Sequence, residues 1–366
     1  MQDSLQRPLH VLLCPDRPSW SFDNIAINIS RSIDGVRIDR LYAKDFVDEP
    51  HVFFETVLRT NVDLCHLFWR EDLFFLFHPH TVREAANRLG ISFESLVRGI
   101  NSCAFTTSVY DHLFSEPEEL LSRRTGFALT DGYSVSSNKL MQVYNGIDGL
   151  PEPDMVIPDG VDIDRFSPSG RPQENHGTFK IGWAGNSQWG RDKLGFDVKG
   201  FDRIFKPMSD ILRKRGIEVE ERIADPHVNR IPFDEMPDFY AQLDLFVCTS
   251  AMEGTPNPVL EAMASGVPVI STDVGIVPEV FGDLQQRFII RDPQPDRFAD
   301  AASELHRNLE LRRAIIAESR SRALEWSWTK TSRDWKPFWE TALRRAMSKR
   351  NAKRRETLLL LREKYI

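Results

Sequence analysis

The sequence predicts a mixed α/β protein of two domains, each built around a parallel sheet. Three observations lead to this prediction. The chain has 366 residues, more than the roughly 100–200 of an ordinary domain. Strand-like apolar runs alternate with helix-like runs along its whole length, as in parallel sheets with crossover helices. The polar segment 167–178, "SPSGRPQENHGT", interrupts this alternation and is typical of a linker.

The first half contains several strand-like runs separated by helical patterns. The helix expected near 81–90 closes on Gly90, a residue that favours the end of a helix. The segment 154–162 ends this half with a strand and a turn. The other strands are expected at 10–14, 62–69 and 103–109, and another helix at 21–33.

The second half restarts with a strand at 179–185 and repeats the same alternation. Strands are expected at 218–224 and 245–250, with helices at about 200–215 and 236–243. Helices from about 296 complete the chain, and they include the aromatic-rich stretch 326–345. We therefore predict a first domain, a linker, a second domain and terminal helices, with bounds at 1–166, 167–178, 179–325 and 326–366.

The composition is that of a soluble globular protein, with 41% hydrophobic and 28% charged residues. We expect no signal peptide and no membrane span, because no apolar run approaches about 18 residues. A cytoplasmic location follows as an expectation.

The net charge of −7 is unevenly distributed along the chain. From Arg344 to Ile366 there are nine Lys and Arg against Glu356 and Glu363, a net charge of about +7. This tail is either a solvated helix end or a peripheral contact with the anionic inner face of a membrane. The rest of the chain is acidic, so we expect no nucleic-acid partner.

The four cysteines lie singly within apolar runs, without the spacing of a zinc site. We interpret them as small buried hydrophobic residues. The sequence "DID" at 162–164 could suggest a pair of metal-binding aspartates, but its place before the linker favours a turn. No metal or cofactor is expected.

The segment 249–273, "TSAMEGTPNPVLEAMASGVPVISTD", is expected to form a loop, a helix and a strand. Asn257 is a suitable N-cap, and Pro258 suits the first helical position. Free amides at such a helix start attract phosphate, whereas Glu253 before the helix and Glu261 inside it can accept hydrogen bonds from hydroxyls. A phosphate between hydroxyl-bearing groups describes a sugar nucleotide. The alternative is that Glu261 only complements the helix dipole and Glu253 is a surface residue.

These residues resemble the signature of the retaining family-4 glycosyltransferases of GT-B fold. Glu253 and Glu261, with seven residues between them, are followed by "AMASGVPVISTDVGIVPEVF". "MVIPDGVDIDRFSP" is similar to the family's segment before the linker, with Asp159 where Asn is usual. "IGWAGN" and "KGFDRI" resemble the opening of its second domain. The resemblance implies two Rossmann-like domains facing across a cleft, with a C-terminal helix crossing back to the first.

The resemblance also implies roles for individual residues of the second half. Glu253 would face the donor sugar, Glu261 would bind the ribose hydroxyls, and Lys199 would hold the diphosphate. The chain has Asn186 where the family usually has an arginine after the turn glycine, so Arg191 is a candidate replacement. The donor-binding residues implied are Gly185, Asn186, Arg191, Lys199, Thr255, Pro256, Asn257 and Glu261.

The first half is implied to hold the acceptor. Asp111 and His112 stand where the family often has a His–Asp type pair, so His112 would contact the donor sugar or an acceptor hydroxyl. A partly buried histidine satisfied by backbone is the alternative. Trp20 and Arg17 lie in a loop without glycine and are acceptor-side candidates, since a tryptophan there would narrow the cleft or stack on a sugar.

The function implied is transfer of a sugar from a nucleoside diphosphate to a glycan or lipid-linked acceptor, with retained configuration. Synthesis of a cell-surface polysaccharide or glycoconjugate would be the setting. Two alternatives remain open: a nucleotide-sugar epimerase or hydrolase on the same fold, and a sugar-nucleotide sensor without catalysis.

Overall fold

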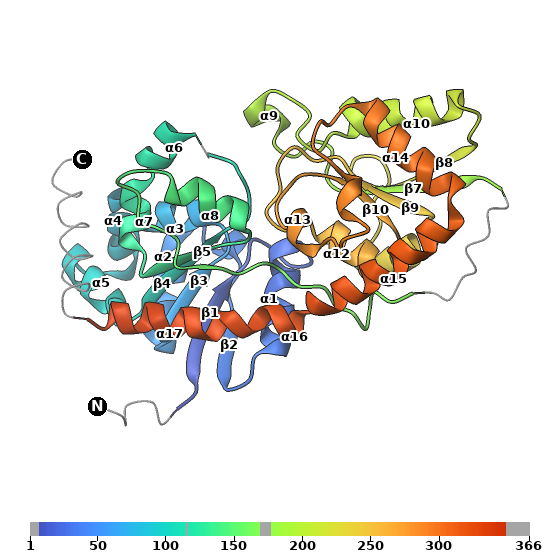
Figure 1. The fold of residues 1–366 in the computed structure, drawn as a ribbon. Helices are drawn as coiled ribbons and strands as arrows, with labels where there is room; N and C mark the ends of the chain where they lie inside the picture. The colour runs from blue at the N-terminus through green and yellow to red at the C-terminus, as the bar shows by residue number, and fades with distance from the viewer. Residues whose placement is uncertain (1–6, 115, 169–176, 349–366) are drawn as a thin grey trace. The chain divides into compact units, whose positions relative to one another are not determined.

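The computed structural model describes residues 7–114, 116–168 and 177–348. They form two compact units (Figure 1). One unit contains the described residues up to Ile157 together with those from Ser332 onward, and the other runs from Pro158 to Thr331.

The first unit is built on a sheet of six parallel strands. Their order is β2-β1-β3-β4-β5-β6, so the chain reverses its direction of winding between β1 and β3. β1, β3, β4 and β5 are completely buried, as expected for strands covered by helices on both faces. The strands are Leu9–Cys14 (β1), Val36–Arg40 (β2), Leu64–Leu67 (β3), Ala104–Val109 (β4), Gly132–Val135 (β5) and Met155–Val156 (β6).

The helices of the first unit connect these strands. Helix α4 illustrates why the local sequence specifies them: Pro79 occupies its first turn, and it ends at Gly90, whose φ of 68° suits glycine. The helices are Ser21–Ser32 (α1), Pro50–Thr60 (α2), Arg70–Leu76 (α3), Pro79–Leu89 (α4), Phe93–Ile100 (α5), Pro117–Ser122 (α6), Arg124–Leu129 (α7), Asn138–Asn145 (α8) and Trp335–Ala346 (α17).

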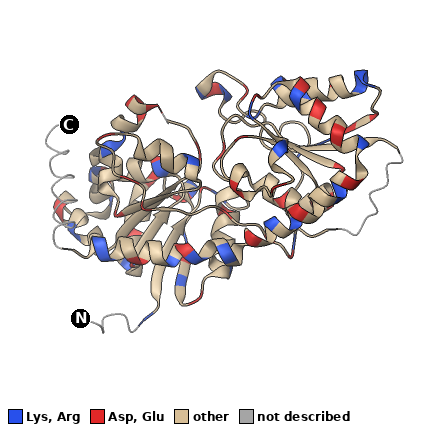
Figure 2. Cartoon of the chain, in the orientation of Figure 1, with Lys and Arg blue, Asp and Glu red and all other residues tan. Residues whose placement is uncertain are grey.

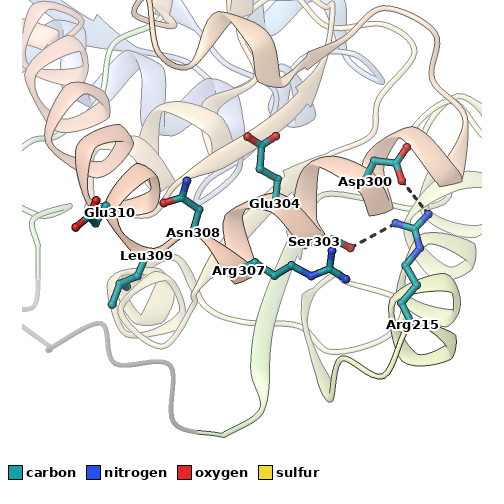
Figure 3. A pocket seen from close by; sticks show the side chains of 8 residues that line it. All are labelled: Arg215, Asp300, Ser303, Glu304, Arg307, Asn308, Leu309 and Glu310. Carbon is teal, nitrogen blue, oxygen red and sulfur yellow. Dashed lines mark hydrogen bonds and ion pairs between the residues drawn. The ribbon is translucent and has the colours of Figure 1, made fainter.

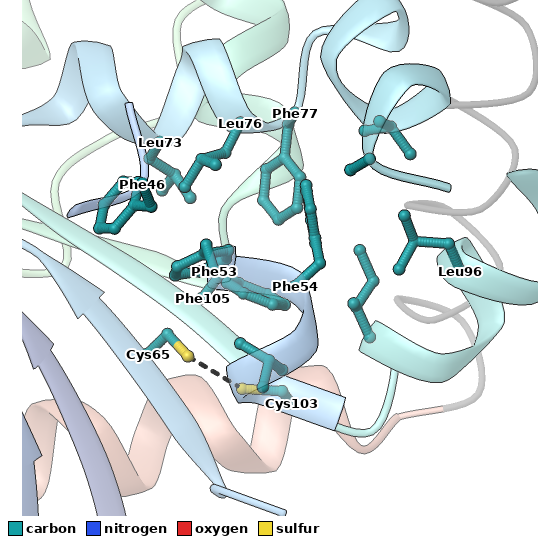
Figure 4. Close-up of a cluster of buried hydrophobic side chains, with 14 of the residues drawn as sticks. Phe46, Phe53, Phe54, Cys65, Leu73, Leu76, Phe77, Leu96, Cys103 and Phe105 are labelled. Carbon is teal, nitrogen blue, oxygen red and sulfur yellow. Dashed lines mark hydrogen bonds between the residues drawn. The ribbon is translucent and has the colours of Figure 1, made fainter. Parts of the chain in front are cut away.

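An aromatic core fills one side of this sheet (Figure 4). Phe53, Phe77 and Phe105 are fully buried there, with tilted and edge-on ring contacts at 4.9–6.3 Å between centroids. The Sγ atoms of Cys65 and Cys103 lie 3.5 Å apart in this cluster. All four cysteines are buried, as predicted for small apolar residues.

Helix α17 packs against β4 and β5 of the first sheet, as the sequence predicted for a helix that returns to this half. Trp335 of this helix lies edge-on to His66 of β3 at 4.9 Å. His66 is fully buried, and burial lowers its pKa to about 3, so the ring is neutral and structural. Arg345 fixes the other end of the helix through its ion pair with Asp154 at 2.5 Å.

The second unit has a sheet of five parallel strands in the order β11-β10-β9-β7-β8. Counted along the chain, this is the same winding pattern as in the first sheet, with the reversal between β7 and β9. The strands are Phe179–Ala184 (β7), Val219–Ala224 (β8), Leu245–Cys248 (β9), Val269–Thr272 (β10) and Ile289–Ile290 (β11).

Helices cover both faces of the second sheet, with separate apolar clusters between helices and strands. The helix expected over 200–215 begins as a wider π-helical turn, Phe201–Phe205, before α10. The helices are Arg191–Leu194 (α9), Lys206–Lys214 (α10), Met236–Ala241 (α11), Asn257–Ala264 (α12), Val277–Val280 (α13), Pro295–Arg307 (α14), Leu309–Glu325 (α15) and Trp328–Thr331 (α16).

Residues 158–166, which the sequence assigned to the first half, pack in the second unit. The backbone amide of Val161 donates to the carbonyl of Trp326 at 2.9 Å, and Trp328 donates back to Val161 at 3.2 Å. Asp162 Oδ1 accepts from the amides of Asp164 and Arg165 at 3.2 and 3.0 Å. The aspartates at 162 and 164 therefore belong to a turn, as predicted.

Acidic and basic residues are interspersed along the helices of both units (Figure 2). The predicted linker is described only at 167–168 and 177–178, and most of the basic tail, from 349 onward, lies outside the described residues. No helix in the described part of the chain is long and apolar enough to cross a membrane.

Candidate functional site

The reversal of winding between β7 and β9 locates a candidate site in the second unit. In open parallel sheets, ligands bind beyond the carboxyl ends of the strands at such a reversal, because the two flanking loops diverge there. Gly185 and Asn186 follow β7, and Thr249 to Glu253 follow β9. Lys199 lies later in the long connection from β7 to β8.

The position of Lys199 is fixed by backbone contacts to the loop after β9. Its carbonyl accepts from Thr249 Oγ1 at 2.7 Å, and the carbonyl of Val198 accepts from the amide of Ala251 at 2.7 Å. Gly200 has a φ of 69°, and a Cβ there would collide with the Thr249 carbonyl. Position 200 therefore requires glycine so that the loop carrying Lys199 and the loop after β9 can approach closely.

Lys199 and Glu253 form an ion pair at this edge of the sheet. Nζ of the lysine lies 2.5 Å from Oε1 of the glutamate, and the two side chains are only 15% and 18% exposed. The lysine also lies 4.7 Å from the ring centroid of Trp189, within cation–π range. A partly buried ammonium next to a carboxylate can thus face a ligand that carries both negative charge and hydroxyls.

The loop after β10 contacts the loop that carries Glu253. The amide of Ile276 donates to the carbonyl of Gly254 at 3.1 Å. Gly275 has a φ of 47°, and a Cβ there would overlap the same carbonyl. Glycine at 275 thus allows the backbones of these two loops to touch.

The start of helix α12 differs from the prediction in one respect. Asn257 was expected to cap the helix, but it is the first helical residue, and Pro256 occupies the cap position without a side-chain cap. The Asn257 Nδ2 group donates instead to Asp159 Oδ2 at 3.1 Å. The backbone amide of Asp159 donates to Thr255 Oγ1 at 3.2 Å. A tertiary contact has replaced the local cap.

Glu261 lies one turn further along α12 and is half-buried. Its Oε2 accepts a hydrogen bond of 2.8 Å from the hydroxyl of Tyr240 on α11. Burial raises the pKa of Glu261 to about 7, and the Tyr240 hydrogen bond and the charge of Arg165 oppose this shift. The carboxyl is therefore ordered and can accept further hydrogen bonds once it is ionised.

The remaining predicted donor residues have other partners. Asn186 Oδ1 accepts from the amide of Gln188 at 3.0 Å and so stabilises the turn after Gly185. Arg191 donates to Asp202 Oδ2 at 2.6 Å and lies 3.2 Å from Asp197. Its charge is thus directed to the carboxylates of Asp197 and Asp202.

The predicted acceptor-side residues lie in the first unit. Asp111 Oδ1 accepts from Arg70 at 3.2 Å and from the amide of Leu113 at 2.8 Å, while the neighbouring His112 is half-buried. The guanidinium of Arg17 stacks over the ring of Trp20 at 4.2 Å, and Trp20 is 47% exposed. The structure therefore gives Asp111 an ion-pairing role and leaves Trp20 accessible.

Sequence reasoning missed three contributors: Trp189, Tyr240 and the pairing of Asp159 with Asn257. Tyr240 precedes Glu261 by 21 residues and Asp159 precedes Asn257 by 98. No local pattern signals such contacts, because they depend on which strands become neighbours.

A separate polar hollow of the second unit lies between α10 and α14 (Figure 3). Arg215, which follows α10, pairs there with Asp300 at 2.8 Å and donates to Ser303 at 3.4 Å. None of the predicted site residues lines it. In the described ranges no group of three or more His, Cys, Asp or Glu side chains could hold a metal ion.

Comparison with known proteins points to one class of enzyme. Residues 198–322, which include Lys199, Glu253 and Glu261, match the family model described as glycosyl transferases group 1.

Two curated bacterial relatives are 40% identical to parts of the chain. One is the lipopolysaccharide core biosynthesis mannosyltransferase LpsB of Rhizobium meliloti (strain 1021), over 93 residues, 24% of this chain and 26% of the relative. The other is the putative teichuronic acid biosynthesis glycosyltransferase TuaC of Bacillus subtilis (strain 168), over 219 residues, 53% of this chain and 51% of the relative. The chain thus spans between a quarter and about half the length of these relatives.

Solved structures resemble the chain over nearly its full length. A glycosyltransferase from Rickettsia africae ESF-5 superimposes with a TM-score of 0.62 at 14% identity, covering 92% of this chain and 99% of that one. Anabaena Alr3699/HepE in complex with UDP and glucose gives 0.61 at 13% identity, covering 90% and 99%. The fold is therefore that of the GT-B glycosyltransferases, with two Rossmann-like domains.

Proposed function

We propose that this chain is a retaining glycosyltransferase that transfers a sugar from a nucleoside diphosphate to a glycan or lipid-linked acceptor. The observation that carries the proposal is the 2.5 Å ion pair of Lys199 and Glu253 at the winding reversal of the second sheet, with Glu253 eight residues before Glu261 of α12. The family model that matches residues 198–322 supports it.

Each charged group has a task in this proposal. Lys199 and the positive end of the α12 dipole stabilise negative charge on the diphosphate, which grows as the glycosidic bond breaks. Glu253 accepts hydrogen bonds from the donor sugar. Glu261, oriented by Tyr240, accepts from the ribose hydroxyls.

The proposed reaction is a front-face substitution. The bond between the anomeric carbon and the diphosphate oxygen breaks, and the acceptor oxygen bonds to the same face of that carbon. The acceptor proton passes to the leaving phosphate oxygen, so no separate enzyme base is required. We expect no metal requirement, and unchanged turnover in the presence of a chelator would agree with that expectation.

The first experiment identifies the donor. UDP-, GDP-, ADP- and TDP-sugars are compared by thermal shift, since a ligand that binds the folded chain raises its melting temperature. A UDP-linked sugar is the natural starting point because Alr3699/HepE was solved with UDP and glucose. A nucleotide-linked mannose is the second choice, since LpsB is named a mannosyltransferase.

The second experiment identifies the reaction. With the best donor and a set of glycan acceptors, nuclear magnetic resonance of the first product reports the anomeric configuration. Retention supports the proposal, whereas inversion overturns the retaining mechanism. Release of free sugar without an acceptor indicates a hydrolase, an isomerised donor indicates an epimerase, and binding without turnover indicates a sensor.

The setting remains a proposal as well. Relatives named for lipopolysaccharide core and teichuronic acid synthesis support a role in making a surface polysaccharide. The basic tail, outside the described residues from 349 onward, is proposed to bring the protein to an anionic membrane. Equal binding of full-length and tail-deleted protein to anionic vesicles would reject that idea.

A further inference from the structure

The pair formed by Asp159 and Asn257 contains two unsatisfied oxygen atoms. Asp159 is 3% exposed, and its Oδ2 accepts from Asn257 Nδ2 at 3.1 Å. The other oxygen of each side chain, Oδ1 of Asp159 and Oδ1 of Asn257, is buried and has no hydrogen-bond partner among the described residues. Buried oxygens without partners are unfavourable, and here they belong to the two halves of one contact.

A single proton would satisfy both atoms. A carboxylic acid and a primary amide can pair through two hydrogen bonds, in which the amide N–H donates to one carboxyl oxygen and the acid O–H donates to the amide oxygen. One of these bonds is present between Nδ2 and Oδ2. The second needs a proton on Asp159 Oδ1, directed to Asn257 Oδ1.

We propose that Asp159 is a protonated positioning residue that clamps the loop from Thr255 to Asn257 by a two-bond acid–amide pair, and that ionisation of Asp159 releases this clamp. That this loop serves a sugar-nucleotide donor rests on the proposed function, but the clamp itself does not.

The backbone around Asp159 provides a rigid anchor for such a clamp. Gly160 packs so closely on helix α16 that a Cβ would lie 2.7 Å from the Trp328 amide nitrogen. Val161 is hydrogen bonded to Trp326 and Trp328. The amide of Asp159 donates to Thr255 Oγ1 at 3.2 Å, so the loop is held at both Thr255 and Asn257.

The protonation state agrees with this arrangement. Burial raises the pKa of Asp159 to about 7, and the Asn257 amide opposes the shift. Charged neighbours on the surrounding elements are engaged with other groups. They are Glu253 with Lys199, Glu261 with Tyr240, Arg165 with Asp234, Lys330 with Glu325, and Asp162 with the amides of its own turn.

The direction in which pH changes the order of the loop follows from the protonated and ionised forms of Asp159. Below its pKa the acid donates to Asn257 Oδ1, and both buried oxygens are satisfied. Above it the proton is lost to solvent, and both buried oxygens are left without a hydrogen-bond partner. The loop should therefore be ordered at low pH and loosened as the pH rises through about 7.

The test uses the full chain without donor or acceptor. Aspartate labelled with carbon-13 in its carboxyl group is incorporated, and the Asp159 signal is identified by its loss in Asp159→Asn. We expect this signal to titrate near pH 7 rather than near the ordinary pKa of 3.8 for aspartate. Titration in the ordinary range overturns the proposal.

Hydrogen exchange of the Thr255 and Asn257 amides, corrected for its intrinsic pH dependence, measures the clamp. In the wild type we expect protection to fall about tenfold across the titration of Asp159, the factor that one hydrogen bond supplies. Asp159→Asn can form an amide–amide pair with two bonds at any pH, so its protection should stay constant. Glu261→Gln is the matched control and should retain the wild-type pH dependence.

Two outcomes overturn the clamp. One is that amide protection in the wild type does not change with pH. The other is that Asp159→Asn loses as much amide protection with rising pH as the wild type does. If Asp159→Asn does not fold, the Asn257 side-chain amide signals of the wild type, assigned with Asn257→Ser, replace it as the readout. They should shift in the same pH range, and constant shifts overturn the proposal. A chain that transfers no sugar yet shows this titration rejects the proposed function alone.

Discussion

Nζ of Lys199 and Oε1 of Glu253 lie 2.5 Å apart, although 54 residues separate them in the sequence. They come from the loops after β7 and β9, which diverge at the winding reversal of the second sheet. In the absence of ligand each charge neutralises the other. A nucleoside diphosphate would draw the lysine towards its phosphates and leave the glutamate to the sugar.

Replacing either partner should therefore abolish most of the transfer activity. We expect Lys199→Ala and Glu253→Ala each to lower kcat by at least about 100-fold, the scale seen when one electrostatic contact to a transition state is lost. The double variant should lose less than the product of the single losses, because the two residues interact. Lys206→Ala, which removes an exposed ion pair with Asp202, is the control. Near-normal rates in both single variants would defeat the assignment.

Nucleotide binding should depend on pH through Glu261. Its pKa is about 7, and the ionised carboxylate accepts stronger hydrogen bonds from the ribose hydroxyls than the protonated acid does, so affinity for the nucleoside diphosphate should rise as the pH increases through 7. Glu261→Gln should bind more weakly and without this pH dependence. Calorimetric titration between pH 6 and pH 8 measures both effects, and an identical pH profile in Glu261→Gln would contradict the role.

The hydroxyl of Tyr240 should matter for the same site. Tyr240→Phe removes the 2.8 Å hydrogen bond to Glu261 and should weaken nucleotide binding by about tenfold, the net value of one hydrogen bond to a charged group. It should also raise the pKa of Glu261 further, since this hydrogen bond lowers it. Tyr42→Phe, which removes a hydroxyl bonded to Asp23, is the control and should bind normally. Equal affinities of the two variants would exclude the effect.

Three buried carboxyls should each lower protein stability as the pH rises from about 4 to about 7, whereas His66, whose pKa is lowered, acts in the opposite direction. Asp72, Asp159 and Glu261 have pKa values raised to about 7 by burial, against ordinary values of 3.8 and 4.5. At these three groups the folded chain thus binds more protons than the unfolded chain, and each group lowers the free energy of unfolding by up to about 1.4 kcal/mol per pH unit. Asp72→Asn should make the free energy of unfolding of the first unit depend less steeply on pH. Denaturant unfolding at several pH values measures this dependence. The exposed Asp48→Asn should leave the slope unchanged, and a slope unaffected by Asp72→Asn would argue against its burial as the cause.

Gly200 should be far less replaceable than Gly195, although their φ angles are nearly equal at 69° and 73°. A Cβ at 195 meets nothing within 4 Å, so Gly195→Ala should cost only the backbone strain of about 1 kcal/mol. At 200 it would collide with the Thr249 carbonyl, so Gly200→Ala should cost about 3 kcal/mol or more and displace Lys199. Chemical unfolding measures the free energy of unfolding of the two variants. Equal losses would mean that the loops around Gly200 move apart at little cost in free energy.

The sequence by itself determined the two-sheet α/β organisation, and its family resemblance made Lys199, Glu253 and Glu261 the candidate site residues. Apolar periodicity, helix-ending glycines and the spacing of the two glutamates are local properties, so they can be read along the chain. The pattern at 81–90 ended at Gly90 as predicted, because a left-handed residue is needed there whatever surrounds the helix.

Only the tertiary structure determined which residues distant in the sequence contact one another. Asn257 was predicted as a helix cap, yet its amide bonds to Asp159, because a buried carboxyl competes with the backbone for the same side chain. The segment 158–166 joins the second unit through hydrogen bonds to Trp326 and Trp328. Such contacts depend on the order of strands in the sheet, which is set by the packing of elements distant in sequence, and a local pattern carries no information about it.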